Sequence, residues 1–210
     1  MKTIFIPAKI KSEINAKKIS ELKIPKNIAI AYSIQYKEIA EQIQKILSKN
    51  HKITSFVQVL GCSKPKFSKD TKAILLISSG EFHAISLAVS IDLPVYVIES
   101  NKIKKFSKEE IDLFNKRKKG SYMKFLNADK VGILISTKPG QENLHKAISL
   151  KNKIKNKDVY FFISNEINTK EFENFPEIKS WVNTACPRLD FDNSVINFAD
   201  LNFGKSKNSL

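Results

Sequence analysis

The sequence Trp-Val-Asn-Thr-Ala-Cys-Pro-Arg at residues 181–188 joins an apolar run to a cysteine and then to a proline. Pro187 ends any regular strand, because proline lacks an N–H group and has a fixed φ. Cys186 is therefore expected on a loop at the end of a strand, with its thiol free to point into a cleft. Arg188 follows two residues later, and a guanidinium nearby favours the thiolate, the form that binds metals or attacks electrophiles. A buried structural cysteine is the alternative, since unpaired cysteines are among the most buried residues.

The second of the chain's two cysteines, Cys62, lies in a segment of the same design. An apolar run, Val57–Leu60, precedes it, and Pro65 follows three residues after it. The two cysteines are too far apart in sequence for a zinc knuckle or a CxxC redox pair. If Cys62 and Cys186 serve one site, we expect each to come from a different structural unit.

The composition is that of a globular protein with room for one or two compact units. The 210 residues are 42% hydrophobic and 27% charged, which is typical of folded domains. The longest apolar runs are of strand length, well short of the roughly 20 residues that span a bilayer. The N-terminus shows no signal-peptide pattern, and two cysteines do not make a disulfide framework. We therefore expect a cytoplasmic protein.

The net charge of +15 raises the possibility of a nucleic-acid partner. However, Arg117 and Arg188 are the only arginines, so 36 − 2 = 34 of the basic residues are lysines, and these are spread along the chain. Such a composition is typical of an A/T-rich coding sequence, and scattered lysines usually form a solvated surface. We expect no direct nucleic-acid partner and no membrane partner.

Apolar strand-length runs alternate with amphipathic stretches along the chain. This pattern predicts an α/β fold of two related βαβ-type units with mostly parallel sheets, at residues 1–101 with Cys62 and 102–210 with Cys186. Sites in such sheets lie at the carboxyl ends of strands, where both cysteines are expected. Expected strands span residues 3–6, 27–33, 53–59, 73–78, 95–99, 131–136, 159–164 and 180–185. Expected helical segments lie within 9–26, 36–49, 82–91, 102–127 with an interruption at Gly120, 142–156 and 169–174.

Residues 78–83, Ser-Ser-Gly-Glu-Phe-His, connect an expected strand to an expected helix. Gly80 permits a tight turn, and the first N–H groups of the helix are free to hold an anion or a carboxylate. One glycine is a weak signal, however, because any strand–helix turn can use it. His83 either contacts a ligand or, more commonly for such a histidine, caps or packs against the helix.

Residues 136–141, Ser-Thr-Lys-Pro-Gly-Gln, are expected to be the equivalent loop of the second unit. Lys138 could meet a carboxylate or phosphate, and Gln141 could bind a polar ligand. A Pro-Gly turn with helix-capping chemistry is the alternative. Together with the cysteines, the two loops predict one polar cleft. Its lining residues are expected to be Gly80, Phe82, His83, Lys138, Gln141 and Arg188.

Five segments together resemble the archaeal 2-(3-amino-3-carboxypropyl)histidine synthase family, which performs the first step of diphthamide biosynthesis. The resemblance covers nearly the whole chain, and its last motif, with Asp192 after it, is the most specific. The matching segments are Gln58–Cys62, Ser79–His83 followed by Leu87-Ala88, Lys116-Arg117, Thr137–Gln141 and Val182–Arg188.

The resemblance implies three similar α/β units, each of which gives one cysteine to a [4Fe–4S] cluster. Cys62 and Cys186 would be two of these metal ligands. In this family the fourth iron binds S-adenosylmethionine. Reductive cleavage of S-adenosylmethionine there yields a 3-amino-3-carboxypropyl radical, which adds to a histidine of translation elongation factor 2. Lys138 or Arg188 would hold the carboxylate of the methionine moiety.

The chain departs from the family pattern in its cysteine count. Met1–Pro7 resembles the end of the family's first unit, and the cysteine of that unit has no counterpart here. The family motif around His83 also has a proline and a glycine where this chain has Ala84 and Ser86. The nearby Asp190, Asp192 and His83 are poorer ligands for iron–sulfur chemistry. The third thiolate is therefore expected from a partner that carries the missing first unit or from a synthase subunit.

Two other functions remain open at this level. One is a non-catalytic binding or electron-relay subunit of the same system. The other is a small nucleotide- or anion-binding α/β protein without a metal.

Overall fold

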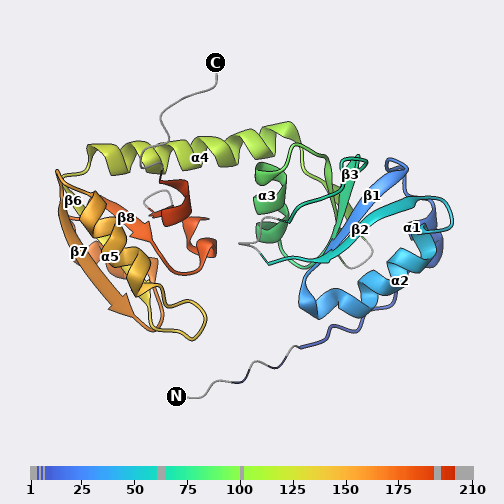
Figure 1. Ribbon diagram of the computed structural model, residues 1–210, viewed down its shortest axis with the longest axis horizontal. Coiled ribbons are helices and arrows are strands. Elements are labelled where there is room, and N and C mark those ends of the chain that lie inside the picture. Colours follow the sequence, from blue (N-terminus) through green and yellow to red (C-terminus); the bar gives the residue numbers. More distant parts are fainter. Residues whose placement is uncertain are drawn as a thin grey trace. The chain divides into compact units, whose positions relative to one another are not determined.

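The structure is a computed structural model that describes residues 4, 6, 8–60, 65–99, 102–191 and 195–201 (Figure 1). It divides into two compact units, Met1–Asp112 and Leu113–Leu210. The helix α4 (Lys108–Asn127) begins in the first unit and continues into the second.

The first unit contains a five-stranded sheet with the strand order β2-β1-β3-β4-β5. The first four strands in that order are parallel, and β5 pairs with β4 in the antiparallel direction. Its elements are α1 (Ala16–Ser20), β1 (Asn27–Tyr32), η1 (Ile34–Tyr36), α2 (Lys37–Leu47), β2 (Lys52–Gln58), β3 (Ala73–Ile77), α3 (Glu81–Ser90), β4 (Val95–Glu99) and β5 (Lys102–Lys105).

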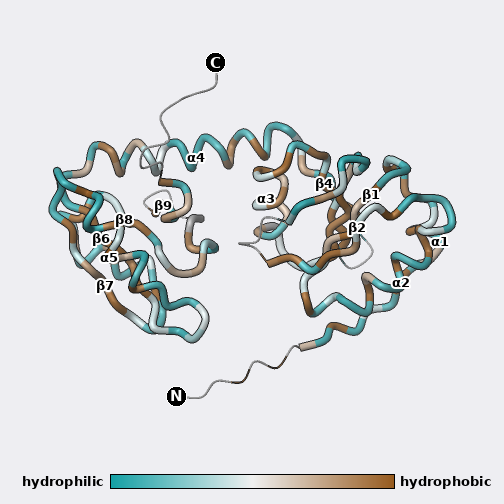
Figure 2. Tube along the Cα trace, viewed as in Figure 1, coloured by the Kyte–Doolittle hydropathy of each residue, from teal (hydrophilic) through white to brown (hydrophobic). Residues whose placement is uncertain are grey.

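The central strands β1 and β3 are almost completely buried, as expected for parallel strands covered on both faces. On one face, Ile39, Ile43 and Leu47 of α2 pack against alternate residues of these strands. On the other face, Ala84 and Leu87 of α3 pack against the intervening residues. Figure 2 shows this pattern, with apolar residues concentrated on the strands and alternating with polar ones along α2.

The second unit contains a parallel four-stranded sheet with the order β7-β6-β8-β9. Ala147 and Leu150 of α5 cover one face together with Phe125 of α4, and Figure 1 shows α5 lying over this sheet. Trp181 and its aromatic neighbours cover the other face. The elements are β6 (Lys130–Ser136), α5 (Leu144–Lys153), β7 (Asp158–Ser164), η2 (Thr169–Asn174), β8 (Ser180–Asn183), η3 (Pro187–Phe191), β9 (Val195–Asn197) and η4 (Phe198–Asp200).

The expected fold class is confirmed, but several elements differ from expectation. Lys102–Lys105 forms the edge strand β5, so it joins the sheet of the first unit, and the division between the units falls inside α4. A short lysine-rich edge strand has no apolar alternation by which to recognise it. The helix α4 continues through Gly120 without interruption. Ile4 and Ile6 belong to no strand, and the rest of the expected strand at residues 3–6 lies outside the described residues.

The two units follow the same strand order. In each, the first strand leads through a helix to an edge strand, and the third strand then pairs on the other side of the first. Thus β1, β2, β3 and β4 correspond to β6, β7, β8 and β9. The expected equivalence of the loops at 78–83 and 136–141 is therefore wrong, because the first follows β3 and the second follows β6. The counterpart of the loop after β3 is the Cys186 loop after β8.

Candidate functional site

A cavity of about 360 Å³ opens at the carboxyl edge of the sheet in the second unit. Parallel strands end at the same edge, so the loops after β6, β7 and β8 meet there. Four residues expected at the site, Lys138, Gln141, Cys186 and Arg188, line this cavity, which we call the Cys186 pocket. The others are Ser136, Asn165, Glu166, Ile167 and Leu189.

Cys186 is half-buried and forms no disulfide. The side chain of Asn183 holds the backbone of its loop from inside. The Asn183 Nδ2 donates to the Cys186 carbonyl oxygen at 2.7 Å, and the Asn183 Oδ1 accepts from the Ala185 N–H at 2.9 Å. These two hydrogen bonds fix the backbone of the loop beyond the end of β8.

A second asparagine, Asn197 at the end of β9, completes this support. Its Oδ1 accepts from the Asn183 Nδ2 at 2.7 Å, and its Nδ2 donates to the Pro187 carbonyl oxygen at 3.0 Å. We call Asn183 and Asn197 the amide pair; only 2% and 4% of their surfaces are exposed. Buried amides that are fully paired in this way stabilise one conformation. Sequence reasoning noted Asn183 within its motif but gave no role to either residue.

Lys138 is already paired within the protein. Its Nζ lies 2.6 Å from Oε1 of Glu166, in the segment after β7. The hydrogen bond from Lys138 and its positive charge hold the pKa of Glu166 below its usual value. Arg188 is exposed and makes no hydrogen bond or ion pair with any residue that the structure describes. A ligand carboxylate entering the Cys186 pocket would therefore find Arg188 available, whereas Lys138 would have to leave Glu166.

The loop at Gly80 lies against a separate cavity of about 360 Å³ in the first unit. Gly80 has φ 75° and stands directly before α3. Its N–H donates to Oε1 of Glu99 at 3.1 Å. The N–H of this N-cap residue thus already has a carboxylate partner from the end of β4, whereas free N–H groups in the first turn of α3 stay a prediction.

Phe82 and His83 lie in the first turn of α3, where both are half-buried. Their rings meet edge to face with centroids 5.7 Å apart. Neither residue is among those that line the cavity at Gly80. Gly80, Phe82 and His83 thus belong to the first unit, and the residues of the Cys186 pocket belong to the second. One cleft shared by both groups stays a prediction.

The chain matches a family model described as "Putative diphthamide synthesis protein" over residues 1–199. The chain belongs to this family. It is 31% identical to the 2-(3-amino-3-carboxypropyl)histidine synthase of Pyrococcus horikoshii over 64% of this chain and 40% of that protein. It is 28% identical to 2-(3-amino-3-carboxypropyl)histidine synthase subunit 1 of Yarrowia lipolytica, over 64% of this chain and 32% of that protein.

Two solved structures share the fold. The crystal structure of Dph2 from Pyrococcus horikoshii with a 4Fe-4S cluster matches with a TM-score of 0.69 and 24% identity, over 85% of this chain and 56% of that one. A second crystal structure of the same protein matches with a TM-score of 0.71, over 89% of this chain and 58% of that one. The expected family resemblance is confirmed. The chain spans about two fifths or less of the curated relatives and a little over half of the solved structures.

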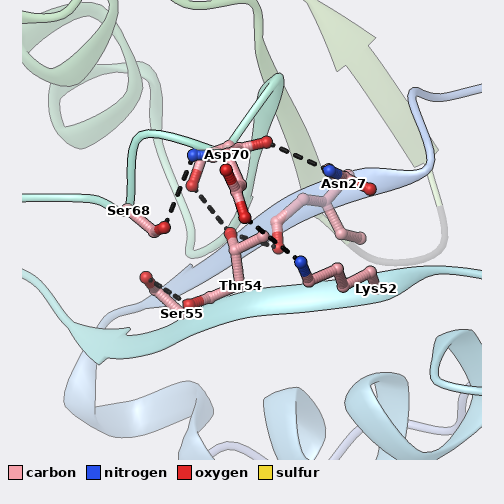
Figure 3. A network of polar contacts seen from close by, with 8 residues as sticks. Asn27, Lys52, Thr54, Ser55, Ser68 and Asp70 are labelled. Atoms are coloured by element: carbon pink, nitrogen blue, oxygen red, sulfur yellow. Dashed lines mark hydrogen bonds and ion pairs between the residues drawn. The ribbon is translucent and has the colours of Figure 1, made fainter.

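Cys62 lies outside the described residues. The segment that follows it is held by polar contacts to β1 and β2 (Figure 3). The Asp70 carbonyl oxygen accepts from Asn27 Nδ2 at 3.2 Å, and Oδ2 of Asp70 lies 3.2 Å from Lys52 Nζ. The hydroxyls of Thr54 and the buried Thr71 lie 2.7 Å apart. These contacts fix the end of the connection that carries Cys62 at the amino ends of β1 and β2.

The donor chemistry of the Cys186 pocket fits one ligand position of an iron–sulfur cluster. Cluster irons are held by cysteine thiolates, and Cys186 presents an unpaired thiol to the pocket. Within the described ranges, no three His, Cys, Asp or Glu residues lie together as a metal site would require. Asp190 lies in η3, and Asp192 lies outside the described residues.

None of the helices that the structure describes combines the length and the apolar character needed to cross a bilayer.

Proposed function

We propose that this chain acts in the first step of diphthamide biosynthesis, as part of an enzyme that transfers a 3-amino-3-carboxypropyl group from S-adenosylmethionine to a histidine of translation elongation factor 2. The observation that supports it is the meeting of Cys186, Arg188, Lys138 and Gln141 in one pocket of a chain from this family. A thiol for a metal and groups for a carboxylate are two of the things that this reaction needs from the protein.

Cys186 and Cys62 would each hold one iron of a [4Fe–4S] cluster. When bound and reduced by an external one-electron donor, the cluster would supply the electron that cleaves a carbon–sulfur bond of S-adenosylmethionine. The amide pair holds the backbone of the Cys186 loop, which would limit the rearrangement that iron binding by this thiol requires. We expect the sulfurs of Cys62 and Cys186 to lie within ~10 Å of each other in the cluster-bound state, as ligands of one cluster must.

The polar residues of the pocket would bind the amino-carboxypropyl part of the substrate. Arg188 would hold the carboxylate through a charge-assisted hydrogen bond, which is stronger than a neutral one. Lys138 would strengthen this contact if the carboxylate replaces Glu166 as its partner. Gln141 offers an amide for the substrate's polar atoms, and Gly80, Phe82 and His83 would complete the site from the first unit.

The chain has only two cysteines, whereas three thiolates are needed if one iron is to stay open to the substrate. We therefore expect a partner that supplies the third, such as a small α/β protein with one cysteine at the end of a strand. The test is anaerobic iron–sulfur reconstitution of the chain alone and with that partner, followed by iron counting and an assay for 5′-methylthioadenosine with S-adenosylmethionine and dithionite as the electron donor. Cluster and product are expected only with the partner, and Cys186→Ser should abolish both.

Full cluster loading and turnover by the isolated chain would show that the argument for a third ligand is wrong. Absence of a cluster from both samples would instead support the second candidate, a non-catalytic binding or electron-relay subunit. The shortage of thiolates favours that alternative. It predicts a colourless protein that still binds elongation factor 2 or a synthase subunit.

A further inference from the structure

A second, smaller cavity of about 140 Å³ lies beside the Cys186 pocket in the second unit. The two cavities share Glu166 and Ile167 as lining residues. A group held in the smaller cavity would therefore lie next to a group held in the larger one. Four aromatic side chains line it, and we call it the aromatic pocket: Phe162, Phe172, Phe175 and Trp181.

These rings are fixed by contacts with one another. Phe172 stacks on Trp181 with centroids 4.0 Å apart, and Phe162 meets Trp181 edge to face at 4.6 Å. Trp181 is only 3% exposed and lies against the backbone of β6, where a Cβ on Gly132 would come within 2.5 Å of the indole. Phe175, in contrast, is 40% exposed. The pocket thus has rigid, flat walls on the core side and an accessible edge at Phe175.

Two carboxylates, of Glu166 and Glu171, lie at the rim of the aromatic pocket. Glu166 is paired with Lys138, and Glu171 accepts hydrogen bonds from Asn168 and Asn174. Each carboxylate can accept a further hydrogen bond, since its two oxygens carry about four lone-pair positions. Carboxylates accept hydrogen bonds from N–H groups, and aromatic faces attract N–H edges and cations. The pocket therefore suits a flat ring that carries N–H groups.

We infer that the aromatic pocket binds the imidazole ring of the acceptor histidine; this inference rests on the proposed function. The cavity has the size of a single planar ring and is too small for a nucleoside. An imidazole there would stack on the aromatic walls and direct an N–H toward Glu166 or Glu171. The shared wall at Glu166 and Ile167 would place this ring beside the substrate held by Arg188. A lysine ammonium would use the same carboxylates, but it has no flat ring to stack on the walls.

The pocket contains its own probe, because Trp181 is the only tryptophan of the chain. The chain alone is titrated with N-acetylhistidinamide at pH 8, where the imidazole is mostly neutral, and Trp181 fluorescence is followed. We expect a saturable change with millimolar affinity, as befits so small a ligand. The corresponding phenylalanine and lysine amides are expected to bind at least about five-fold more weakly, because each lacks either the N–H groups or the flat ring.

Two variants test whether the signal arises in the pocket. Phe175→Ala changes an exposed wall, and Glu171→Gln removes one rim charge; each should weaken binding of N-acetylhistidinamide several-fold. Tyr160→Ala is the matched control, since Tyr160 is an exposed aromatic residue of the same sheet outside the pocket and its loss should change nothing. Circular dichroism confirms that each variant is folded.

Three results would overturn the inference. These are a strictly linear collisional quenching, an unchanged affinity in Phe175→Ala, and equal or tighter binding of the lysine amide, which would indicate a cation site instead. The titration needs neither cluster nor S-adenosylmethionine. Its failure is therefore distinct from failure of the proposed function, which is judged by 5′-methylthioadenosine formation in the reconstituted complex.

Discussion

The two units have the same strand order but carry their cysteines after different strands. Cys186 follows β8, whose counterpart in the first unit, β3, leads instead to Ser78–Gly80. Cys62 follows β2, whose counterpart in the second unit, β7, leads to Glu166. The units thus share their strand order, but the cysteine follows a different strand of that order in each unit.

The two corresponding loops are also held by different means. In the first unit, Gly80 at positive φ leads directly into the ten-residue helix α3, and Glu99 accepts its N–H. In the second unit, the 3₁₀-helix η3 takes the place of α3, and the amide pair supplies the hydrogen bonds. Side-chain amides can replace backbone partners where a loop has no regular structure. The Cys186 loop therefore depends on buried side chains, whereas the Gly80 loop depends on its helix.

The largest expected effect comes from Asn183→Ala. The substitution removes three hydrogen bonds and leaves buried polar groups without partners, so we expect the second unit to lose about 3 kcal/mol of stability. Denaturant unfolding followed by Trp181 fluorescence reports this unit specifically. Alkylation of Cys186, followed by mass spectrometry of its peptide, should become faster. Asn152→Ala, an exposed site on α5, is the control and should change stability by less than about 0.5 kcal/mol.

Gly132→Ala tests the other face of the second sheet. Both sheets have small residues on their first strand, Ala29 and Ala31 against α3 and Gly132 against Trp181. A Cβ at position 132 would overlap the buried indole, so we expect a loss of about 1–3 kcal/mol. Gly120→Ala in α4 meets no atom within 4 Å and should instead stabilise the protein by about 0.5–1 kcal/mol. Equal effects of the two substitutions would contradict the close contact at Trp181.

Glu99→Ala measures what holds the Gly80 loop. It removes one hydrogen bond at a partly exposed site, so we expect a loss of only about 0.5–1.5 kcal/mol. Amide hydrogen exchange should rise in the first turn of α3 and stay unchanged in the Cys186 loop. A loss of stability as large as that of Asn183→Ala would contradict the view that the Gly80 loop is supported by its helix and the Cys186 loop by side chains.

Lys138→Met should have the smallest effect on stability, because the Lys138–Glu166 pair is exposed and such pairs contribute little. Its readout is the pKa of Glu166, which should rise toward the usual value once the hydrogen bond and charge of Lys138 are gone. Because folding lowers this pKa, the pair's contribution is present above the unfolded-state pKa and is lost as the pH falls through the folded-state pKa. An NMR titration of the Glu166 carboxyl measures the change, and an unaltered pKa would argue against the pairing.

The α/β class, most of the strands, and the position of Cys186 after one of them could be predicted from the sequence alone. These features are local: apolar runs and helical periodicity act over a few residues, and Pro187 ends a strand wherever the chain goes next. The grouping of Lys138, Gln141, Cys186 and Arg188 also followed, because parallel strands end at one edge.

Which strands are neighbours, and therefore which loops correspond, could not be predicted and is seen only in the folded chain. Strand order depends on contacts between residues far apart in sequence, which no local pattern records. For the same reason, three pairings were not expected. These are the ion pair of Lys138 with Glu166, the hydrogen bond from the Gly80 N–H to Glu99, and the hydrogen bond between Asn183 and Asn197. The short strand β9 carries that asparagine, and three residues are too few to show a periodicity. The sequence gives the chemistry of each side chain, but the fold determines which partner that side chain contacts.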